Sequence, residues 1–435
     1  MQRKLKQRLT SLLCALLTAS IMLFAGPAFS IDLIESYELA VQNSSELAAA
    51  NLDSQAGELN LDITKATSIF PTITIGAMSE RKNKFVGANT RIDRANVTLS
   101  QTLWRESLGA GLKFSEQQEI LAGLIYRKAQ TNLIKQVVDA YFNVLAAQDT
   151  LETNRSEIES IRVLLDHTVV RREAGVGTET DVRIAESRLA LANAGVIMAE
   201  TAVENANLAL SELIGHRATN IDQLNDDAPT PSMKSELVED WTQLALKNNI
   251  DLQIQQVQVN LAERSIQLAT SDYDFAAHLN FRVNEKLGGT ESLNDHSIAS
   301  ITISKPFSAG GAESRLKKQA TLQYEAELQR LKALRNRTAT FTSSTFRSTA
   351  SLIEQIDALD VAVNAVQSSY ELTQSNYDVG LVTSLEVLDA QQDLFEARRT
   401  LREAHYAYLR SLIELELVAG TLDLSDLHAL NNLLL

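Results

Sequence analysis

The stretch NYDVGLVTSLEVLDAQQ (376–392) places a glycine turn between two long helix-like segments, with an acid three residues after a threonine. An earlier stretch, RREAGVGTETDVRIAES (171–187), has the same layout 205 residues before it. At this offset both halves of the chain align, for example Asn43 with Asn248, Tyr141 with Phe346 and Gly215 with Gly420. The period is too long for a solenoid repeat, so the sequence predicts a duplication of one large unit.

Each half has the same predicted order of elements. A modest helix (about 46–69 and 249–274) and two extended stretches precede a very long helix (about 112–172 and 314–378). The glycine tips (about 173–178 and 379–384) and the final helices (about 178–214 and 384–419) follow. The segment NDDAPTPSMKS, with Pro229 and Pro231, is typical of a linker. We therefore expect structural repeats at 31–228 and 229–435.

The final helices carry a regular apolar seam. Apolar or small residues follow a strict 3-4-3-4 spacing from Val387 to Val418, and the first half repeats it from Val182 to Leu213. A 3.5-residue period over more than four heptads indicates a coiled-coil seam, whereas an ordinary bundle helix shows a wider 3.6-residue stripe. Helices of about 60 residues span roughly 90 Å, which predicts a tall, thin helical body.

The first 30 residues are typical of a secretory signal peptide cleaved near Ser30. They combine a basic start, an apolar core and a small-residue exit, although a retained membrane anchor is the alternative. Cys14 is the only cysteine of the chain. Leu13 before it argues against a lipid-modified cysteine. The expected mature protein therefore has no disulfide and depends on packing or oligomerisation.

The mature chain is strongly acidic and lacks enzyme motifs. Four basic residues and no acids leave with the signal region, so the net charge becomes 36 − 55 = −19, which argues against a nucleic-acid partner. The six histidines are scattered, and the sequence has no HExxH, no GxSxG and no phosphate-binding glycine loop. We expect no catalytic residues, no metal and no cofactor. No other stretch has 18 consecutive apolar residues, as a membrane-spanning helix would.

Four segments alternate apolar and polar residues with a period of two. They lie at about 72–80, 93–103, 278–286 and 298–307, two in each half. Ten-residue alternation joined by polar loops is the pattern of strands with one lipid-facing side. Four strands cannot close a barrel, and open edges are not tolerated in lipid, so several chains would have to share one barrel. Two small hairpins capping a helical bundle are the alternative.

Several motifs resemble the TolC-like outer-membrane efflux protein family across essentially the whole mature chain. They are YDVGLVTSLEVLDA (377–390), VTLSQTLW, ITISKPFSAGG (301–311), AYFNVLAAQD (140–149) and the ending GTLDLSDLHALNN. The resemblance implies a fold that is mainly α with a membrane β-barrel: a homotrimer with a coiled-coil α-helical barrel in the periplasm and a 12-stranded barrel in the outer membrane of a Gram-negative bacterium.

The same resemblance implies a passive exit duct for multidrug efflux or type I secretion. Its implied partners are a periplasmic adaptor (membrane fusion) protein, an inner-membrane RND, MFS or ABC transporter, and outer-membrane lipid. An exported coiled-coil scaffold or adhesin without a pore is the alternative. It would share the heptads but would not need four amphipathic strands.

The acids at the tips have two interpretations. Thr178 with Asp181 and Thr383 with Glu386 fit capping boxes, which is the favoured interpretation of both acids. Asp389 lies one turn further in and shares a helix face with Glu386. Threefold repetition would place six carboxylates around one constriction and favour cations. The resemblance implies that Glu386 and Asp389 form such a selectivity ring.

The resemblance also implies closing contacts at the tips, and here the sequence departs from the family. Asp181 and Tyr377 match the family's gating positions, but Val382 stands where the family has a basic residue that pairs with the Asp181 position. That ion pair cannot form as such, and Arg171 or Arg172 is the available substitute. Gly175 and Gly380 are expected to supply positive φ at the tips. With Thr178 and Thr383, they are the expected adaptor-docking residues.

Overall fold

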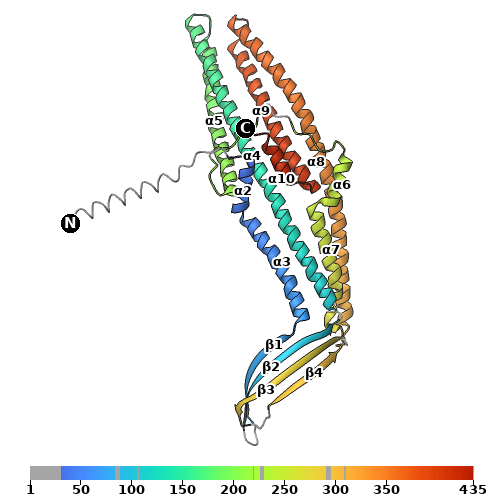
Figure 1. The fold of residues 1–435 in the computed structure, drawn as a ribbon. Coiled ribbons are helices and arrows are strands. Elements are labelled where there is room, and N and C mark those ends of the chain that lie inside the picture. The colour runs from blue at the N-terminus through green and yellow to red at the C-terminus, as the bar shows by residue number, and fades with distance from the viewer. Residues whose placement is uncertain are drawn as a thin grey trace, which may run out of the picture.

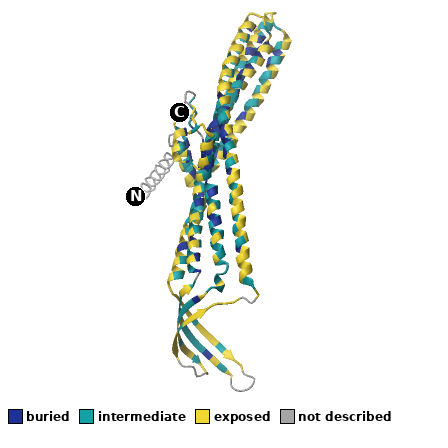
Figure 2. Ribbon diagram, turned by 90° about the vertical axis from the view of Figure 1, so that its right-hand side faces the viewer, coloured by how far each residue is buried: buried dark blue, intermediate teal, exposed yellow. Residues whose placement is uncertain are grey.

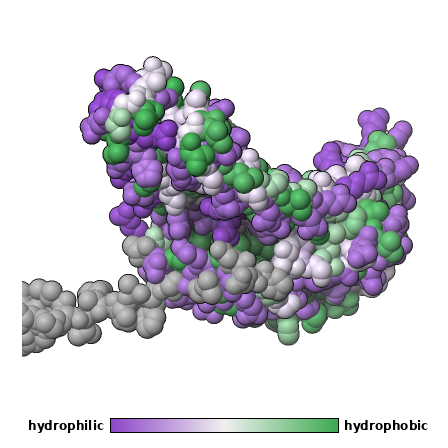
Figure 3. All heavy atoms as spheres, turned by 90° about the horizontal axis from the view of Figure 1, so that it is seen from above, coloured by the Kyte–Doolittle hydropathy of each residue, from purple (hydrophilic) through white to green (hydrophobic). Residues whose placement is uncertain are grey.

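The computed structural model describes residues 31–83, 89–105, 107–218, 220–225, 230–290, 295–307 and 310–434. The expected signal peptide (1–30) and Pro229 lie outside them. The chain forms an elongated helical body with two hairpin tips at one end and a curved sheet at the other (Figure 1). Viewed from the tips, it is an open arc around a hollow (Figure 3).

Two long helices run through most of the helical body. They are α4 (Leu108–Glu173, 66 residues) and α8 (Ala312–Asp378, 67 residues), each about 100 Å long at 1.5 Å per residue. Shorter helices pack along each of them (Figure 1): α3 (Ser45–Ile69) and α5 (Glu179–Ile214) along α4, α7 (Ile250–Leu268) and α9 (Ser384–Ala419) along α8. In each half, the two shorter helices together are nearly as long as the long helix, as the predicted lengths imply.

The predicted seam holds the final helices to their neighbours. No seam position from Val182 to Leu213 or from Val387 to Val418 is exposed. Both helices end at a glycine in the left-handed region, Gly215 at φ 76° and Gly420 at φ 72°. These two glycines occupy equivalent places, so the duplication extends to the helix termini.

Three short helices form a belt around the middle of the body and were not predicted. They are α2 (Leu33–Asn43), α6 (Val238–Asn248) and α10 (Leu424–Asn431). One non-helical residue separates α2 from α3 and α6 from α7. These residues are Ser44 and Asn249, and the side chain of each caps the helix that follows. The second modest helix is also shorter than expected, because the chain turns into a 3-10 segment (Ser271–Tyr273).

The main hydrophobic core lies at this belt, where buried residues concentrate (Figure 2). Tyr141 and Phe142 of α4 pack edge to face there, with ring centroids 6.2 Å apart. The fully buried Tyr141 hydroxyl lies 3.1 Å from the carbonyl oxygen of Ile31 and 3.0 Å from that of Asp222. This contact ties the start of the described chain to the segment that follows the first hairpin.

The sheet is antiparallel in the order β1-β2-β3-β4. Its strands are β1 (Thr72–Lys82), β2 (Thr90–Arg105), β3 (Ala276–Gly289) and β4 (His296–Ser304). The two repeats join where β2 pairs with β3, so β1 and β4 are the outer strands. The register gathers apolar side chains on one face, which we call the apolar face: Ile73, Ile75, Val97, Leu99, Phe281, Val283, Ile301 and Ile303. The other face, which we call the polar face, carries mainly Thr, Ser, Asn, His and Arg, together with Met78, Ile92 and Ile298.

Candidate functional site: the paired hairpin tips

The two hairpin tips are built alike. Gly175 has φ 76° and Gly380 has φ 79°, a region that glycine enters without steric cost. The amide of Gly175 donates to the Arg172 carbonyl, and that of Gly380 donates to the Tyr377 carbonyl. Each tip therefore ends a long helix with a left-handed glycine and leads into the next helix within a few residues.

Capping boxes begin both descending helices. The Thr178 amide donates to Asp181 Oδ2 at 3.1 Å, and the Asp181 amide donates back to Thr178 Oγ1 at 3.1 Å. The Thr383 amide donates to Glu386 Oε2 at 2.7 Å, and the Glu386 amide donates back at 3.4 Å. Each acid thus satisfies an otherwise unpaired amide at a helix start. In Glu386, one carboxylate oxygen, Oε2, accepts this capping hydrogen bond.

Tyr377 is buried between the two hairpins, with 5% of its surface exposed. Its hydroxyl lies 3.1 Å from Thr168 Oγ1 of α4. Arg171, also of α4, donates from Nη1 to the Tyr377 carbonyl at 3.1 Å. The same guanidinium lies 4.8 Å from the centre of the tyrosine ring, a cation–π distance. Three contacts therefore join the end of α8 to α4 at this residue.

Asp181 also links the hairpins. Ser384 Oγ, at the start of α9, donates to Asp181 Oδ1 at 3.1 Å. Hydrogen bonds from Thr178 are the main cause that holds the pKa of Asp181 below its usual value, and Ser384 and the charge of Arg171 act in the same direction. The carboxylate is therefore favoured in its charged form between the two tips.

Asp389 forms an ion pair across the hairpins. Arg188 of α5 approaches Asp389 Oδ1 through Nη2 at 2.7 Å and donates from Nη1 to Gln392 Oε1 at 2.6 Å. The side chains of Arg188 and Asp389 are 33% and 54% exposed, so the pair is accessible to water. The two acids that share a face of α9 thus differ: Glu386 caps its helix, and Asp389 binds an arginine of the other hairpin.

A small apolar cluster underlies these polar contacts. Ile161, Leu164, Ala185, Tyr377, Val387 and Leu388 form it, and they come from all four helices of the two hairpins. Val382 is half-buried against this cluster. The residue at the family's basic position therefore contributes packing, while Arg171 supplies a cation between the tips.

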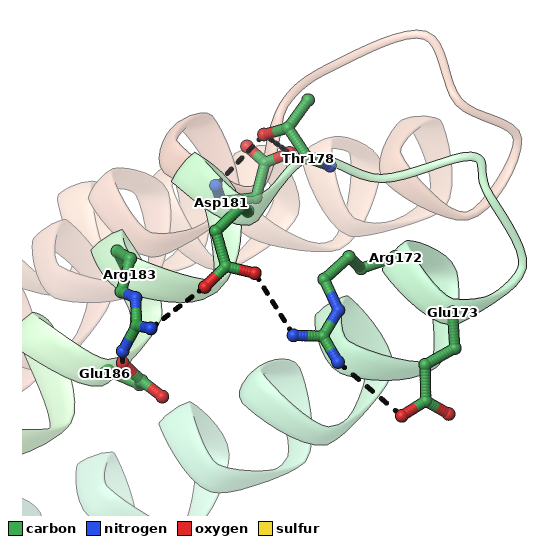
Figure 4. Close-up of polar contacts among 7 residues, drawn as sticks. Arg172, Glu173, Thr178, Asp181, Arg183 and Glu186 are labelled. Atoms are coloured by element: carbon green, nitrogen blue, oxygen red, sulfur yellow. Dashed lines mark hydrogen bonds and ion pairs between the residues drawn. The ribbon is translucent and has the colours of Figure 1, made fainter.

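The first hairpin has a further charged ladder on its surface. Arg172 and Arg183 both reach the carboxylate of Glu179, at 3.1 and 3.0 Å, and Arg183 also contacts Glu186. Figure 4 shows Arg172, Arg183 and Glu186 beside the capping pair Thr178 and Asp181. All these contacts lie within one hairpin and are exposed, so each contributes little to stability. Arg172 therefore differs from Arg171, whose contacts cross to the second hairpin.

Behind the tips lies a cleft of about 520 Å³ between α4, α5 and α9. Burial raises the pKa of Glu157 in it, against the lowering effect of the nearby charges of Arg399 and Arg188. Arg399 donates from Nη1 to Asn154 Oδ1 at 3.1 Å. No group of three His, Cys, Asp or Glu side chains in the described ranges is arranged to hold a metal ion.

Sequence reasoning placed Asp181, Tyr377 and Asp389 at the tips but missed most of their partners. Arg171 was one of two candidates to replace the basic residue that is absent at Val382, and nothing in the sequence of its helix distinguished it from Arg172. Thr168, Arg188 and Ser384 were not identified at all. Their helical positions are ordinary, and only the packing of one hairpin against the other brings them to these acids and to Tyr377.

A long helical body with polar hairpin tips at one end and a sheet with one apolar face at the other defines a membrane-associated export channel. The chain belongs to the outer membrane efflux protein family, whose profile matches residues 36–216 and 241–421. One match falls in each half of the chain. The protein is thus an outer-membrane efflux channel of Gram-negative bacteria and a transport protein rather than an enzyme. A scaffold or adhesin without a pore is excluded.

Curated relatives extend over nearly the whole chain. Outer membrane protein TolC of Vibrio cholerae serotype O1 is 27% identical over 97% of this chain and 98% of its own length. TolC of Escherichia coli strain K12 is 26% identical over 97% of this chain and 89% of its own. The proteases secretion protein PrtF of Dickeya chrysanthemi is 24% identical over 95% and 93%.

Solved structures share the fold at lower identity. CusC superimposes with a TM-score of 0.80 and 18% identity over 90% of this chain and 92% of its own. The outer-membrane channel OprN gives 0.78 and 19% over 89% and 90%. Among the helices of the described residues, none is both long and apolar enough to span a membrane.

Proposed function

We propose that three copies of this chain form one passive duct, with the four-stranded sheets joined into a 12-stranded barrel and the helical bodies into a periplasmic tunnel. The observation that carries the proposal is the sheet itself. It has one apolar face and two outer strands, β1 and β4, whose outer edges have no partner strand among the described residues. Unpaired backbone edges are very costly in lipid, and pairing β1 of one copy with β4 of the next removes them.

The arc-shaped cross-section supports the same assembly, because three arcs placed edge to edge enclose a hollow (Figure 3). The signal peptide at 1–30 would direct export, and the repeats would extend over 31–228 and 229–435. The hairpin tips, with Gly175, Thr178, Gly380 and Thr383, would dock a periplasmic adaptor protein. An inner-membrane RND, MFS or ABC transporter would supply the energy, because the duct has no catalytic machinery of its own.

Covalent capture of the proposed edge pairing tests the assembly. The expected mature chain has no cysteine, so Thr74→Cys in β1 and Ser300→Cys in β4 can be combined on one face of the sheet. A short bismaleimide should link the double variant into covalent trimers that survive denaturing electrophoresis, while either single variant stays monomeric. Reaction products no larger than a monomer, from protein that inserts into bilayers, would refute the proposed barrel.

We further propose that the six tips close the periplasmic end and that Glu386 and Asp389 line the resulting aperture. Three chains would bring six carboxylates together, but each chain also brings Arg188 to Asp389, so the net charge of the ring is −6 + 3 = −3. This ring would still favour cations. The Tyr377 and Asp181 contacts would hold the two hairpins of each chain in the closed arrangement.

Single-channel recording tests the aperture. The double variant Glu386→Ala with Asp389→Ala should lose most of its cation preference and most of its block by trivalent cations. Thr383→Ala is the matched control for loss of the cap, because it breaks the same capping box and keeps both carboxylates. Unchanged ion selectivity in the double variant would remove both carboxylates from the proposed ring.

A further inference from the structure

The apolar face of the sheet ends at a pair of arginines. Arg81 and Arg91 have the same strand parity as Ile73 and Val97, so both lie on the apolar face, at the end of the sheet far from the helices. Phe70, 66% exposed, precedes β1 at the helical end. Arg81 lies eleven residues after Phe70, a distance of about 36 Å for extended chain and about 28 Å in height at a tilt of 35–45°. That height matches the apolar band of an outer-membrane barrel, about 25 Å.

The two arginines face each other directly. Arg81 and Arg91 are cross-strand partners, and like charges in this position destabilise a strand pair. Both side chains are exposed. In the described part of the chain, no hydrogen bond or ion pair engages the Arg81 side chain, and none engages the terminal nitrogens of Arg91. The sequence thus keeps an unfavourable pair of cations where the apolar face meets the outer surface.

Among the described residues, Asp93 is the acid that contacts this pair on the apolar face. Asp93 contacts Arg91 Nε at 2.9 Å and accepts from Ser79 Oγ at 2.6 Å, and it is 20% exposed. Glu80 lies on the opposite, polar face and pairs with Lys82 there at 3.7 Å. Among the described residues, one carboxylate therefore serves two guanidinium groups, and it contacts Arg91 through Nε alone.

We propose that Arg81 and Arg91 together bind a phosphate group of the glycolipid headgroup in the outer leaflet, that is, of lipopolysaccharide. A guanidinium pairs with a phosphate through two parallel hydrogen bonds, and two guanidinium groups on adjacent strands match its several oxygens. A phosphate bound between the arginines attracts both of them and so offsets their mutual repulsion. The inference rests on the proposed placement of the apolar face in the outer membrane.

The test uses the full-length oligomer, delipidated in detergent, with native mass spectrometry as the readout. Three probes are compared: lipopolysaccharide, the same lipid after removal of its phosphates, and phosphatidylglycerol. The wild type should bind the phosphorylated glycolipid about tenfold more tightly than either other probe. Arg81→Gln with Arg91→Gln should abolish this preference, and Arg81→Lys with Arg91→Lys should retain part of it.

A matched control removes two arginines from the polar face, one in β2 and one in β3. Arg94→Gln with Arg282→Gln should leave lipid binding unchanged, because both residues belong to the opposite face. Equal binding of lipopolysaccharide by the wild type and the Arg81/Arg91 glutamine variant would overturn the inference. Equal affinity of the wild type for phosphatidylglycerol would overturn it too, because any anionic lipid would then suffice.

Trimer mass and bilayer conductance are measured on the same wild-type preparation. A preparation that conducts as a trimer but shows no preference for the phosphorylated glycolipid overturns only the phosphate site. A preparation that forms neither trimer nor channel overturns the proposed function itself. Conductance of the Arg81/Arg91 variant confirms that it has folded, so loss of lipid preference cannot be assigned to misfolding.

Discussion

Removing the guanidinium of Arg171 should open the closed tips. Arg171→Ala deletes the hydrogen bond to the Tyr377 carbonyl, 3.1 Å long, and the contact with the tyrosine ring at 4.8 Å. A charge-assisted hydrogen bond at a half-buried site contributes about 1 kcal/mol, and an incompletely buried cation–π contact about 1 kcal/mol more. The loss of about 2 kcal/mol shifts the balance between closed and open hairpins about 30-fold in each chain.

The assay is the open probability of single channels in planar bilayers, and the structure supplies a matched control. Arg172 is the adjacent residue with the same charge, but its contacts, to Glu173 and Glu179, stay within its own hairpin. Arg172→Ala should therefore leave the open probability near that of the wild type. Arg171→Lys should give an intermediate value, because lysine keeps the charge and loses the planar fork. Equal effects of the two alanine variants would refute a specific role for Arg171.

Two further outcomes follow from the same contacts, and two more concern glycines of the helical body. Arg188→Ala should strengthen cation preference and trivalent block, the reverse of removing the aperture acids, because the ring charge becomes −6 instead of −3; unchanged selectivity would contradict the ring. Asp181 has a lowered pKa, so its contribution to closure is complete above the ordinary carboxyl pKa of about 3.9 and is lost as pH falls through the lowered value. Open probability should hence stay constant between pH 7 and 5 and rise only in stronger acid, a response that Asp181→Asn should remove. Gly420→Ala should destabilise the chain by about 2 kcal/mol or more in thermal unfolding, because φ is 72° and the new Cβ would lie 2.3 Å from a backbone oxygen. Gly123→Ala, with open space around it inside α4, should instead stabilise by about 0.5–1 kcal/mol.

The sequence predicted those parts of the fold that repeat locally. The 3-4 spacing of α9 identified its buried seam, and the alternation in β1 and β2 identified one apolar face, because both are properties of consecutive residues. The belt helices α2, α6 and α10 were missed because each has only 8 to 11 residues. Short helices are unstable alone and form because tertiary packing supports them. Here α2 packs against α4 and α5, α6 against α8 and α9, and α10 against α2.

The tip contacts were harder to predict because they depend on how one hairpin lies against the other. The capping boxes at Thr178 and Thr383 were predictable, since an acid three residues after a threonine fixes its own geometry. The pairing of Arg188 with Asp389 was not, since 201 residues separate them and neither helix requires it. Val382 was recognised as unable to form the expected ion pair because its side chain is uncharged. Its packing role was not predicted, because the apolar cluster that it joins is formed by both hairpins.

The contacts between the hairpins involve positions at which the two repeats differ. Arg188 aligns with Asp393, Arg171 with Asn376, and Ser384 with Glu179 at the 205-residue offset. None of these pairs keeps its residue type, whereas the cap threonines and the turn glycines do. The groups that meet across the hairpins are therefore not copies of each other: Arg188 meets Asp389, and Arg171 meets the Tyr377 carbonyl. The conserved layout of the repeats therefore builds each hairpin, and the differences between the repeats join one hairpin to the other.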